Sequence, residues 1–228
     1  MKGLLNKLYQ DKVVKSQIVY NTMLQVDRAD FIEKDPYCDD SQYLGYHVVI
    51  SAPHMHAYAL EYLYPALKNF LNFNPKNFRL LDIGSGSGYL TVCLSKLIKD
   101  QGTVIGIEHI PELYQKGENN IKKHHKNLLD EKKIELYLGD GRTYFKDKPL
   151  FKCIHVGAAA VEPPKEFLDQ LDVGGRLVIP LGTKNYNSSD QFIYFIDKLP
   201  NGQFNYTKGL SVRYVDLTTV EMQSRGFV

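Results

Sequence analysis

Residues 80–88 read Leu80-Leu81-Asp82-Ile83-Gly84-Ser85-Gly86-Ser87-Gly88, and they are the most informative segment of the chain about its fold. Its apolar half predicts a strand buried on both faces of a parallel sheet. The three alternating glycines that follow allow a tight turn in which backbone N–H groups approach a ligand closely. The helix predicted after residue 88 would direct its positive end at an anionic group such as a carboxylate or phosphate. The alternative is a tight turn that binds nothing.

Strands and helices continue to alternate on both sides of this stretch, which predicts an α/β fold with a doubly wound, mostly parallel sheet and antiparallel C-terminal edge strands. Pro65 lacks the amide hydrogen that the Glu61 carbonyl needs, so we expect a kink or two short helices there. Gly174-Gly175 is expected to close the helix opened by Pro163 and Pro164. The expected strands are 78–83, 103–107, 134–138, 151–156, 176–179, 191–198, 204–207 and a β-rich run at 210–215, and the expected helices lie within 4–24 and at 57–71, 90–98, 111–129 and 163–171.

The composition limits the classes of protein to which this chain can belong. The chain has 228 residues with a net charge of +2, so we expect one domain, comprising an N-terminal helical and loop extension at 1–50 and an α/β core at 51–228. The small charge argues against a nucleic-acid partner, and the lack of a long apolar run argues against a membrane partner. Three scattered cysteines and no visible signal peptide indicate a reduced protein of the cytoplasm, and we expect a monomer.

The glycine loop separates two kinds of nucleotide-binding protein. The dinucleotide fingerprint G-x-G-x-x-G needs a small third residue, and Tyr89 occupies that position. NAD is therefore disfavoured. The order of an aspartate followed by G-x-G-x-G resembles instead the first motif of class I S-adenosylmethionine-dependent methyltransferases, which implies a Rossmann-like fold.

Two acidic residues end neighbouring predicted strands. Glu108 stands twenty residues after Gly88, where its oxygens could accept both hydroxyls of a ribose, and the less favoured alternative is a solvated loop glutamate. Asp140, between two glycines, could accept a hydrogen bond from an adenine amino group or could simply make a turn. Together with the glycine loop, they predict a ligand site where open sheets bind ligands.

The segment Ser51-Ala52-Pro53-His54-Met55-His56-Ala57 and the run Gly157-Ala158-Ala159-Ala160 resemble protein-L-isoaspartate (D-aspartate) O-methyltransferases. Other landmarks of that family recur in order from about residue 23 to residue 223. The resemblance implies methyl transfer from S-adenosyl-L-methionine, with S-adenosyl-L-homocysteine as product, to the α-carboxylate of L-isoaspartyl and D-aspartyl residues. The expected partners are damaged proteins and peptides that carry such residues.

The resemblance also implies roles for individual residues. Ser51 would orient the substrate carboxylate through its hydroxyl and would not act as a nucleophile. Neither His54 nor His56 has an acid at a spacing that would orient it, and a third ligand for a metal ion is missing. The residues implied to bind the cofactor are Val48, Val49, Ile50, Ser51, His56, Asp82, Gly84, Ser85, Gly86, Ser87, Gly88, Glu108, His109, Asp140, Gly141, Thr218 and Gln223.

Two departures and two alternative functions remain. Ser41 and Asp216 replace family prolines beside the expected peptide site, which puts peptide preference in doubt. One alternative is a class I methyltransferase acting on a small molecule or nucleic acid, and the other is a non-catalytic cofactor-binding protein. The basic run within residues 122–133 could be a docking patch, but a solvated helix face is the favoured interpretation.

Overall fold

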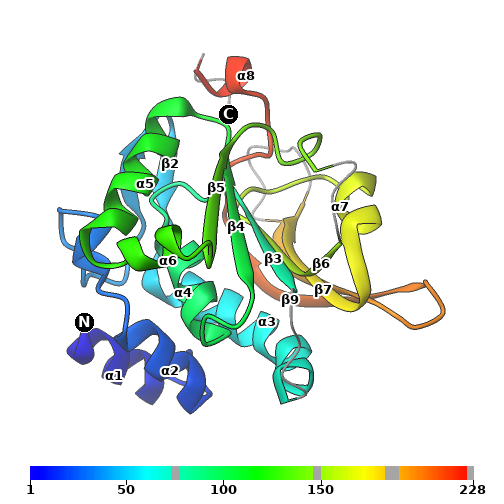
Figure 1. The fold of residues 1–228 in the computed structure, drawn as a ribbon, viewed down its shortest axis with the longest axis horizontal. Helices are drawn as coiled ribbons and strands as arrows, with labels where there is room; N and C mark the ends of the chain where they lie inside the picture. Colours follow the sequence, from blue (N-terminus) through cyan, green and yellow to red (C-terminus); the bar gives the residue numbers. More distant parts are fainter. Residues whose placement is uncertain (73–77, 146–149, 183–189, 225–228) are drawn as a thin grey trace.

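The computed structural model describes residues 1–72, 78–145, 150–182 and 190–224. It confirms the α/β class: one seven-stranded sheet, in the order β5-β4-β3-β6-β7-β8-β9, forms the centre of the molecule (Figure 1). The strands are β3 (Arg79–Ile83), β4 (Thr103–Glu108), β5 (Ile134–Leu138), β6 (Phe151–Val156), β7 (Leu171–Leu181), β8 (Gln191–Lys198) and β9 (Phe204–Val212).

The strand order creates a crevice at one edge of the sheet. Strands β5, β4, β3, β6 and β7 are parallel, and β8 and β9 add the expected antiparallel edge. The chain runs outward from β3 through β4 to β5 and then returns to β6 on the other side of β3. Because this reversal parts the connections at the carboxyl ends of β3 and β6, ligands of open α/β sheets bind there.

The strands are buried on both faces, as the sequence predicts. Successive residues point to opposite faces, so Leu80 joins one hydrophobic cluster and Leu81 the other. The larger cluster includes side chains of α1 to α5, and the smaller includes Phe167 of α7, so helices cover both faces (Figure 1). The helices are α1 (Lys2–Gln10), α2 (Gln17–Leu24), η1 (Arg28–Asp30), α3 (Pro53–Asn72), α4 (Tyr89–Leu97), α5 (Pro111–His124), α6 (Lys126–Asp130), α7 (Lys165–Gln170) and α8 (Val220–Ser224).

Two predicted element boundaries are wrong, and at a third position one of two expected alternatives is not observed. Helix α3 runs as one helix through Pro65, which excludes the pair of short helices and leaves the kink as an expectation. The helix expected at 111–129 is divided at His125, whose ring is buried against Phe31. Helix α7 ends at Gln170, and Gly174-Gly175 lies within the long strand β7, where Gly174 has φ +68°. Tertiary packing decides each boundary more strongly than local propensity does.

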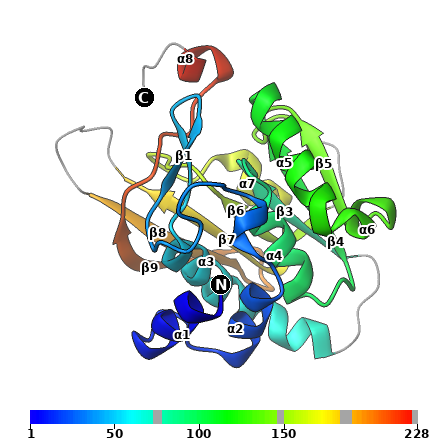
Figure 2. The same cartoon turned by 90° about the vertical axis from the view of Figure 1, so that its left-hand side faces the viewer.

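The N-terminal fifty residues contain a small second sheet that the sequence analysis did not expect. Strands β1 (Gln42–Gly45) and β2 (Val48–Ile50) form an antiparallel hairpin through Tyr46 and His47, which both have positive φ angles. Such angles at both central residues are typical of the tight turns that match strand twist. Figure 2 shows β1 extending from the body of the molecule on the same side as α8.

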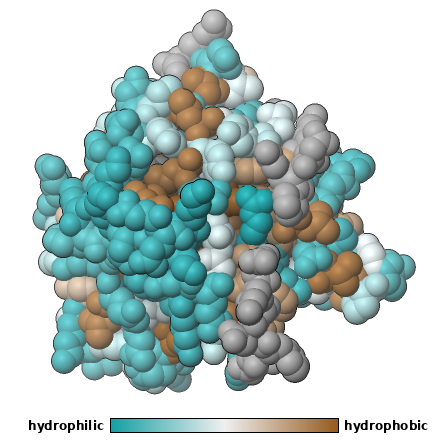
Figure 3. Space-filling view, viewed as in Figure 1, coloured by the Kyte–Doolittle hydropathy of each residue, from teal (hydrophilic) through white to brown (hydrophobic). Residues whose placement is uncertain are grey.

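Figure 3 shows one face that is mostly hydrophilic, with hydrophobic residues in separate areas. Of the basic run, Lys122 and Lys126 form i,i+4 ion pairs with Glu118 and Asp130, as on a solvated helix face. In the described part of the chain, no helix has the length and apolar character needed to cross a membrane.

Candidate active site

A cleft with a cavity volume of about 660 Å³ opens at the carboxyl ends of the central strands. Its size is within the usual range for small-molecule sites. All the residues expected to bind a cofactor line it except Gly88, which instead caps α4. A Cβ at Gly88 would meet Ile121 of α5 at 3.0 Å, so this glycine permits packing behind the loop.

The glycine loop between β3 and α4 has the conformation that its sequence predicts. Gly84, Gly86 and Gly88 have φ angles of +76°, +49° and +84°, a region that disfavours residues with a Cβ. The N–H groups of Gly84 and Ser85 both donate to the Ile107 carbonyl of β4, at 2.9 and 3.1 Å. The loop is therefore fixed to the neighbouring strand before any ligand binds.

Glu108 ends β4 and lies against the glycine loop. Its side chain is 4% exposed and accepts three backbone hydrogen bonds: His109 and Ile110 donate to Oε1 at 2.8 and 3.0 Å, and Gly86 donates to Oε2 at 3.1 Å. Burial raises the pKa of Glu108, and the N–H donors together with His109 oppose that increase. Because a carboxylate oxygen has about two acceptor positions, Oε2 keeps one for a ligand.

Asp82 is the centre of a buried polar chain under the loop. Thr91 Oγ1 of α4 donates to Asp82 Oδ2 at 2.6 Å, and Asp82 Oδ1 lies 2.8 Å from His155 Nδ1 of β6. All three side chains are buried, with exposed fractions of 7% or less. The chain ties β3, α4 and β6 together at the floor of the cleft, so Asp82 acts as an anchor as well as a lining residue.

Ser51 stands between β2 and α3, on the wall of the cleft. The guanidinium of Arg28, which is fully buried, donates from Nη2 to the Ser51 carbonyl at 2.8 Å. On the other side, the Ser51 and Tyr214 side chains are hydrogen-bonded, and burial raises the pKa of Tyr214 to about 12. The phenol therefore stays protonated at neutral pH, and both the backbone and the hydroxyl of Ser51 are held in place.

Arg28 also orients His56. Nη1 of Arg28 lies 3.2 Å from His56 Nδ1, which makes that nitrogen the acceptor and leaves Nε2 to carry the ring proton. Burial and the Arg28 charge lower the pKa of His56 well below its ordinary value, so the ring is neutral at pH 7. In the described ranges, no carboxylate forms an ion pair with Arg28, whose guanidinium lies 5.5 Å from the centre of the Tyr89 ring.

The expectation that no acid orients His54 is wrong. Asp39 Oδ1 lies 2.9 Å from His54 Nδ1 and also accepts the His54 backbone N–H at 2.9 Å. The separation of fifteen residues hid this pair, because the hairpin returns the chain to the start of α3. Among the described residues, no group of three or more histidine, cysteine or acidic side chains could hold a metal ion.

The far wall of the cleft comes from β5 and the C-terminal segment. Both oxygens of Asp140 accept from Arg142, at 2.6 to 3.1 Å, and Arg142 Nη2 also donates to the Thr218 carbonyl at 3.3 Å. Hydrogen bonds from Arg142 lower the pKa of Asp140 against the opposing effect of burial. Asp140 thus lies at the strand end where the sequence predicts it, and its carboxylate is paired with Arg142.

Gln223 of α8 closes the cleft from above. His109 Nε2 lies 3.1 Å from its Oε1, a contact across 114 residues. The side chain is 3% exposed, and its Nε2 is a buried donor without an acceptor among the described residues. A buried polar atom without a partner costs free energy, so this amide is suited to a ligand that supplies an acceptor.

The sequence analysis missed Arg28, His155 and Tyr214 as members of the site. Each of them contacts a site residue that is distant in the sequence. Arg28 and Tyr214 contact Ser51, and His155 contacts Asp82. The available signal was weak: His155 ends an apolar strand next to the Gly157 run, and a charged or polar residue at the end of a parallel strand often faces the ligand. Ser41 and Asp216, the two departures from the family prolines, also line the cleft.

Comparisons with known proteins agree with this geometry. A family model described as protein-L-isoaspartate(D-aspartate) O-methyltransferase matches residues 1–222. A Caenorhabditis elegans protein-L-isoaspartate O-methyltransferase is 44% identical over 96% of this chain and 93% of its own, and Arabidopsis thaliana protein-L-isoaspartate O-methyltransferase 1 is 40% identical over 99% and 94%. A solved Plasmodium falciparum structure assigned to the same enzyme class, in complex with S-adenosyl-L-homocysteine, has 35% identity and a TM-score of 0.81 and covers 95% of this chain and 97% of its own.

Proposed function

This chain belongs to the protein-L-isoaspartate (D-aspartate) O-methyltransferase family, and on that premise we propose how its cleft performs the reaction. The enzyme transfers a methyl group from S-adenosyl-L-methionine to the α-carboxylate of isoaspartyl residues in damaged proteins. We propose that Ser51 holds the substrate carboxylate and that the glycine loop, Glu108 and the C-terminal segment hold the cofactor. The observation that carries this proposal is the convergence of Ser51, the glycine loop and Glu108 on one cleft.

The residues of the cleft fit the cofactor. In the glycine loop, the absence of side chains at the glycines lets backbone N–H groups approach the carboxylate of the cofactor closely. Oε2 of Glu108 keeps an acceptor position for a ribose hydroxyl. Among the described residues, Gln223 Nε2 is a buried donor without a partner. The remaining cofactor residues proposed from the family resemblance stay proposals. Gly88 acts indirectly in this scheme, through the packing of α4 and α5 behind the loop. When bound, S-adenosyl-L-methionine supplies a methyl group activated by a positively charged sulfur.

The chain's own contribution is to position the substrate. A carboxylate with an ordinary pKa of ~4 is already ionised at pH 7, so the protein does not need a strong general base. The Ser51 hydroxyl donates to the substrate carboxylate, while Arg28 and Tyr214 keep Ser51 itself in place. Correct orientation of reacting groups is worth ~7–11 kcal/mol, and exclusion of water strengthens the attraction between carboxylate and sulfonium.

The test uses S-adenosyl-L-methionine labelled in its methyl group and two peptides that differ only in isoaspartate or aspartate at one position. Label in the isoaspartyl peptide alone is the expected result. Label in neither peptide, with cofactor binding intact by calorimetry, would instead favour a methyltransferase of another substrate class. The Ser51→Ala variant, assayed in parallel, separates enzymatic labelling from adventitious reaction.

Three further features remain proposals. The cytoplasm is supported as the location by three free cysteines, which suit a reducing compartment. A single domain is supported by the hydrophobic cluster that joins Leu5 and Val19 to the sheet residues Leu80 and Val104. For a monomer, sedimentation at several protein concentrations would give a constant mass near 26.1 kDa.

A further inference from the structure

Asp216 occupies a fixed position in the cleft wall after β9. It forms an isolated parallel bridge with Ala159, in which Ala159 N donates to the Val215 carbonyl and Leu217 N donates to the Ala159 carbonyl, both at 2.7 Å. The backbone around Asp216 is thus extended and attached to the loop after β6. A side chain on this segment has a defined direction.

That direction is away from the core on which Leu217 packs. Leu217 packs against the hydrophobic cluster under β6 and β7, so its neighbour Asp216 points to the opposite face. Alternate residues of an extended segment share a face, which places Asp216 on the side of Tyr214, whose hydroxyl bonds Ser51. At about 3.3 Å per residue, two residues separate these side chains by roughly 7 Å. Both line the cleft.

Asp216 differs from the other acids of the cleft in its surroundings. Asp82 is bonded to His155 and Thr91, and Asp140 is bonded to Arg142. In the described part of the chain, by contrast, no lysine or arginine lies within ion-pair distance of the Asp216 carboxylate. Its side chain is half-buried, which reduces screening of its charge by solvent.

We propose that Asp216 determines substrate preference: it favours isoaspartyl peptides that carry lysine or arginine within two residues of the damaged site and disfavours those with an acidic neighbour. This inference rests on the proposed function of the cleft. A peptide whose carboxylate meets Ser51 brings its flanking residues within one or two Cα steps of 3.8 Å, comparable with the spacing from Tyr214 to Asp216. A basic side chain there pairs with Asp216, and an acidic one is repelled.

The experiment is a reciprocal exchange of charge. Isoaspartyl peptides with Lys, Gln or Glu at each flanking position are assayed for kcat/KM with the unaltered enzyme, Asp216→Asn and Asp216→Lys. We expect the unaltered enzyme to prefer Lys over Glu by at least about tenfold at low salt, a ratio that shrinks as ionic strength rises. Asp216→Asn should reduce the ratio to about threefold or less, and Asp216→Lys should reverse it.

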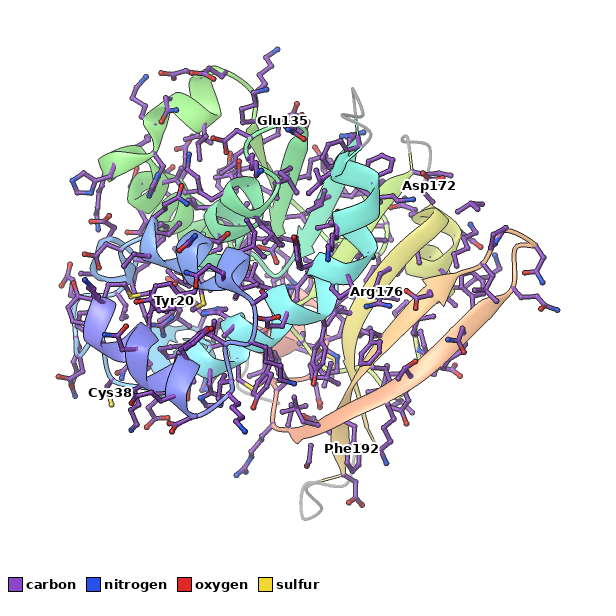
Figure 4. The ribbon with its side chains drawn as sticks, turned by 90° about the horizontal axis from the view of Figure 1, so that it is seen from below. Tyr20, Cys38, Glu135, Asp172, Arg176 and Phe192 are labelled. Carbon is purple, nitrogen blue, oxygen red and sulfur yellow. The ribbon has the colours of Figure 1, made fainter. Side chains whose placement is uncertain are left out.

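Asp172→Lys is the matched control, because it makes the same change in net charge outside the cleft. Asp172, labelled in Figure 4, is the second residue of β7 and lies at the amino end of that strand, opposite the edge that forms the cleft. The control should keep the ratio of the unaltered enzyme. If Asp216→Asn also keeps it while isoaspartyl peptides are methylated, the inference is overturned and the proposed function stands. Failure of the unaltered enzyme to methylate any isoaspartyl peptide would overturn both.

Discussion

Arg28 and Ser51, separated by 23 positions in the chain, are joined by a hydrogen bond of 2.8 Å from the guanidinium Nη2 to the serine carbonyl. The same buried guanidinium contacts His56 Nδ1 and the Tyr89 ring. A buried charge without an ion-pair partner is costly, so its retention at this place needs a compensating interaction. The hydrogen bond to the Ser51 carbonyl supplies one and links the η1 turn to the backbone of Ser51, the residue proposed to hold the substrate carboxylate.

Replacement of Arg28 should therefore lower turnover. Arg28→Met removes the hydrogen bonds to Ser51 and His56. In Arg28→Lys, a single ammonium group cannot reproduce the geometry of the two guanidinium nitrogens. We expect kcat to fall at least about tenfold in Arg28→Met and less in Arg28→Lys, since small displacements of reacting groups reduce rates strongly. Steady-state kinetics on the folded fraction, measured by circular dichroism, gives the result.

Arg176→Met is the matched control. Arg176 also binds a carbonyl of α3, that of Tyr62, at 2.8 Å, but it pairs with Asp197 between α3 and the strands β7 and β8, outside the cleft (Figure 4). The Arg176→Met variant should be less stable to unfolding, while the kcat of its folded fraction should be unchanged. Equal losses of kcat in the two methionine variants would mean that Arg28 has only a structural role.

Tyr214 should act through Ser51. Ser51→Ala should lower kcat while leaving S-adenosyl-L-homocysteine affinity within about twofold, because the proposed role of the hydroxyl is to hold the substrate carboxylate. Tyr214→Phe removes only the partner of that hydroxyl, a hydrogen bond worth ~1 kcal/mol, or about fivefold in rate. In the Ser51→Ala background, Tyr214→Phe should have almost no further effect. Additive losses in this double-mutant cycle would show that the two side chains work independently.

Glu108 should matter for the cofactor. Glu108→Gln keeps the size of the side chain but removes the charge, and hydrogen bonds to charged groups are worth ~1.5–3 kcal/mol. We expect S-adenosyl-L-homocysteine to bind about 10- to 100-fold more weakly by calorimetry. Glu118→Gln on the exposed side of α5 is the control, since Glu118 pairs with Lys122 outside the cleft. Unchanged affinity in Glu108→Gln would contradict the assigned role.

Gly117 permits a close approach between α5 and the glycine loop. A Cβ there would lie 2.6 Å from the Gly86 carbonyl oxygen, whereas a Cβ at Gly3 in α1 meets nothing within 4 Å. Alanine is favoured over glycine inside helices by ~1 kcal/mol. Gly3→Ala should therefore stabilise the protein in urea unfolding, while Gly117→Ala should destabilise it and weaken S-adenosyl-L-homocysteine binding. Equal stabilisation by both would exclude a tight contact at Gly117.

His56 should make stability depend on pH. Its pKa is lowered in the folded protein by burial and by Arg28, so between the unfolded value of about 6.5 and the lower folded value only the unfolded chain binds the proton. The contribution of His56 to the free energy of unfolding is complete above pH 6.5 and is lost as the pH falls, by at most about 1.4 kcal/mol per pH unit. Urea unfolding from pH 7.5 to 5.5 should show a shallower loss in His56→Gln than in the unaltered protein. Equal slopes in the two proteins would show that His56 does not cause the loss.

Local patterns in the sequence were sufficient to predict the sheet and the three strand ends that form the cleft. The apolar run before Gly84, the glycine spacing and the position of Glu108 are local patterns, because a buried parallel strand, a positive φ and a strand end each depend on residues within a few positions. Ser51 was identified from its short segment and lies in the same cleft.

The distant groups that hold these residues in place can be identified only in the folded structure. Arg28, His155, Tyr214 and Asp39 act on partners between 15 and 163 positions away in the sequence. Helix α3 also continues through Pro65, where local propensity predicted a kink or two short helices. Hydrogen bonds between remote segments form only when folding brings their atoms within about 3 Å, and no periodicity or spacing along the chain encodes that distance.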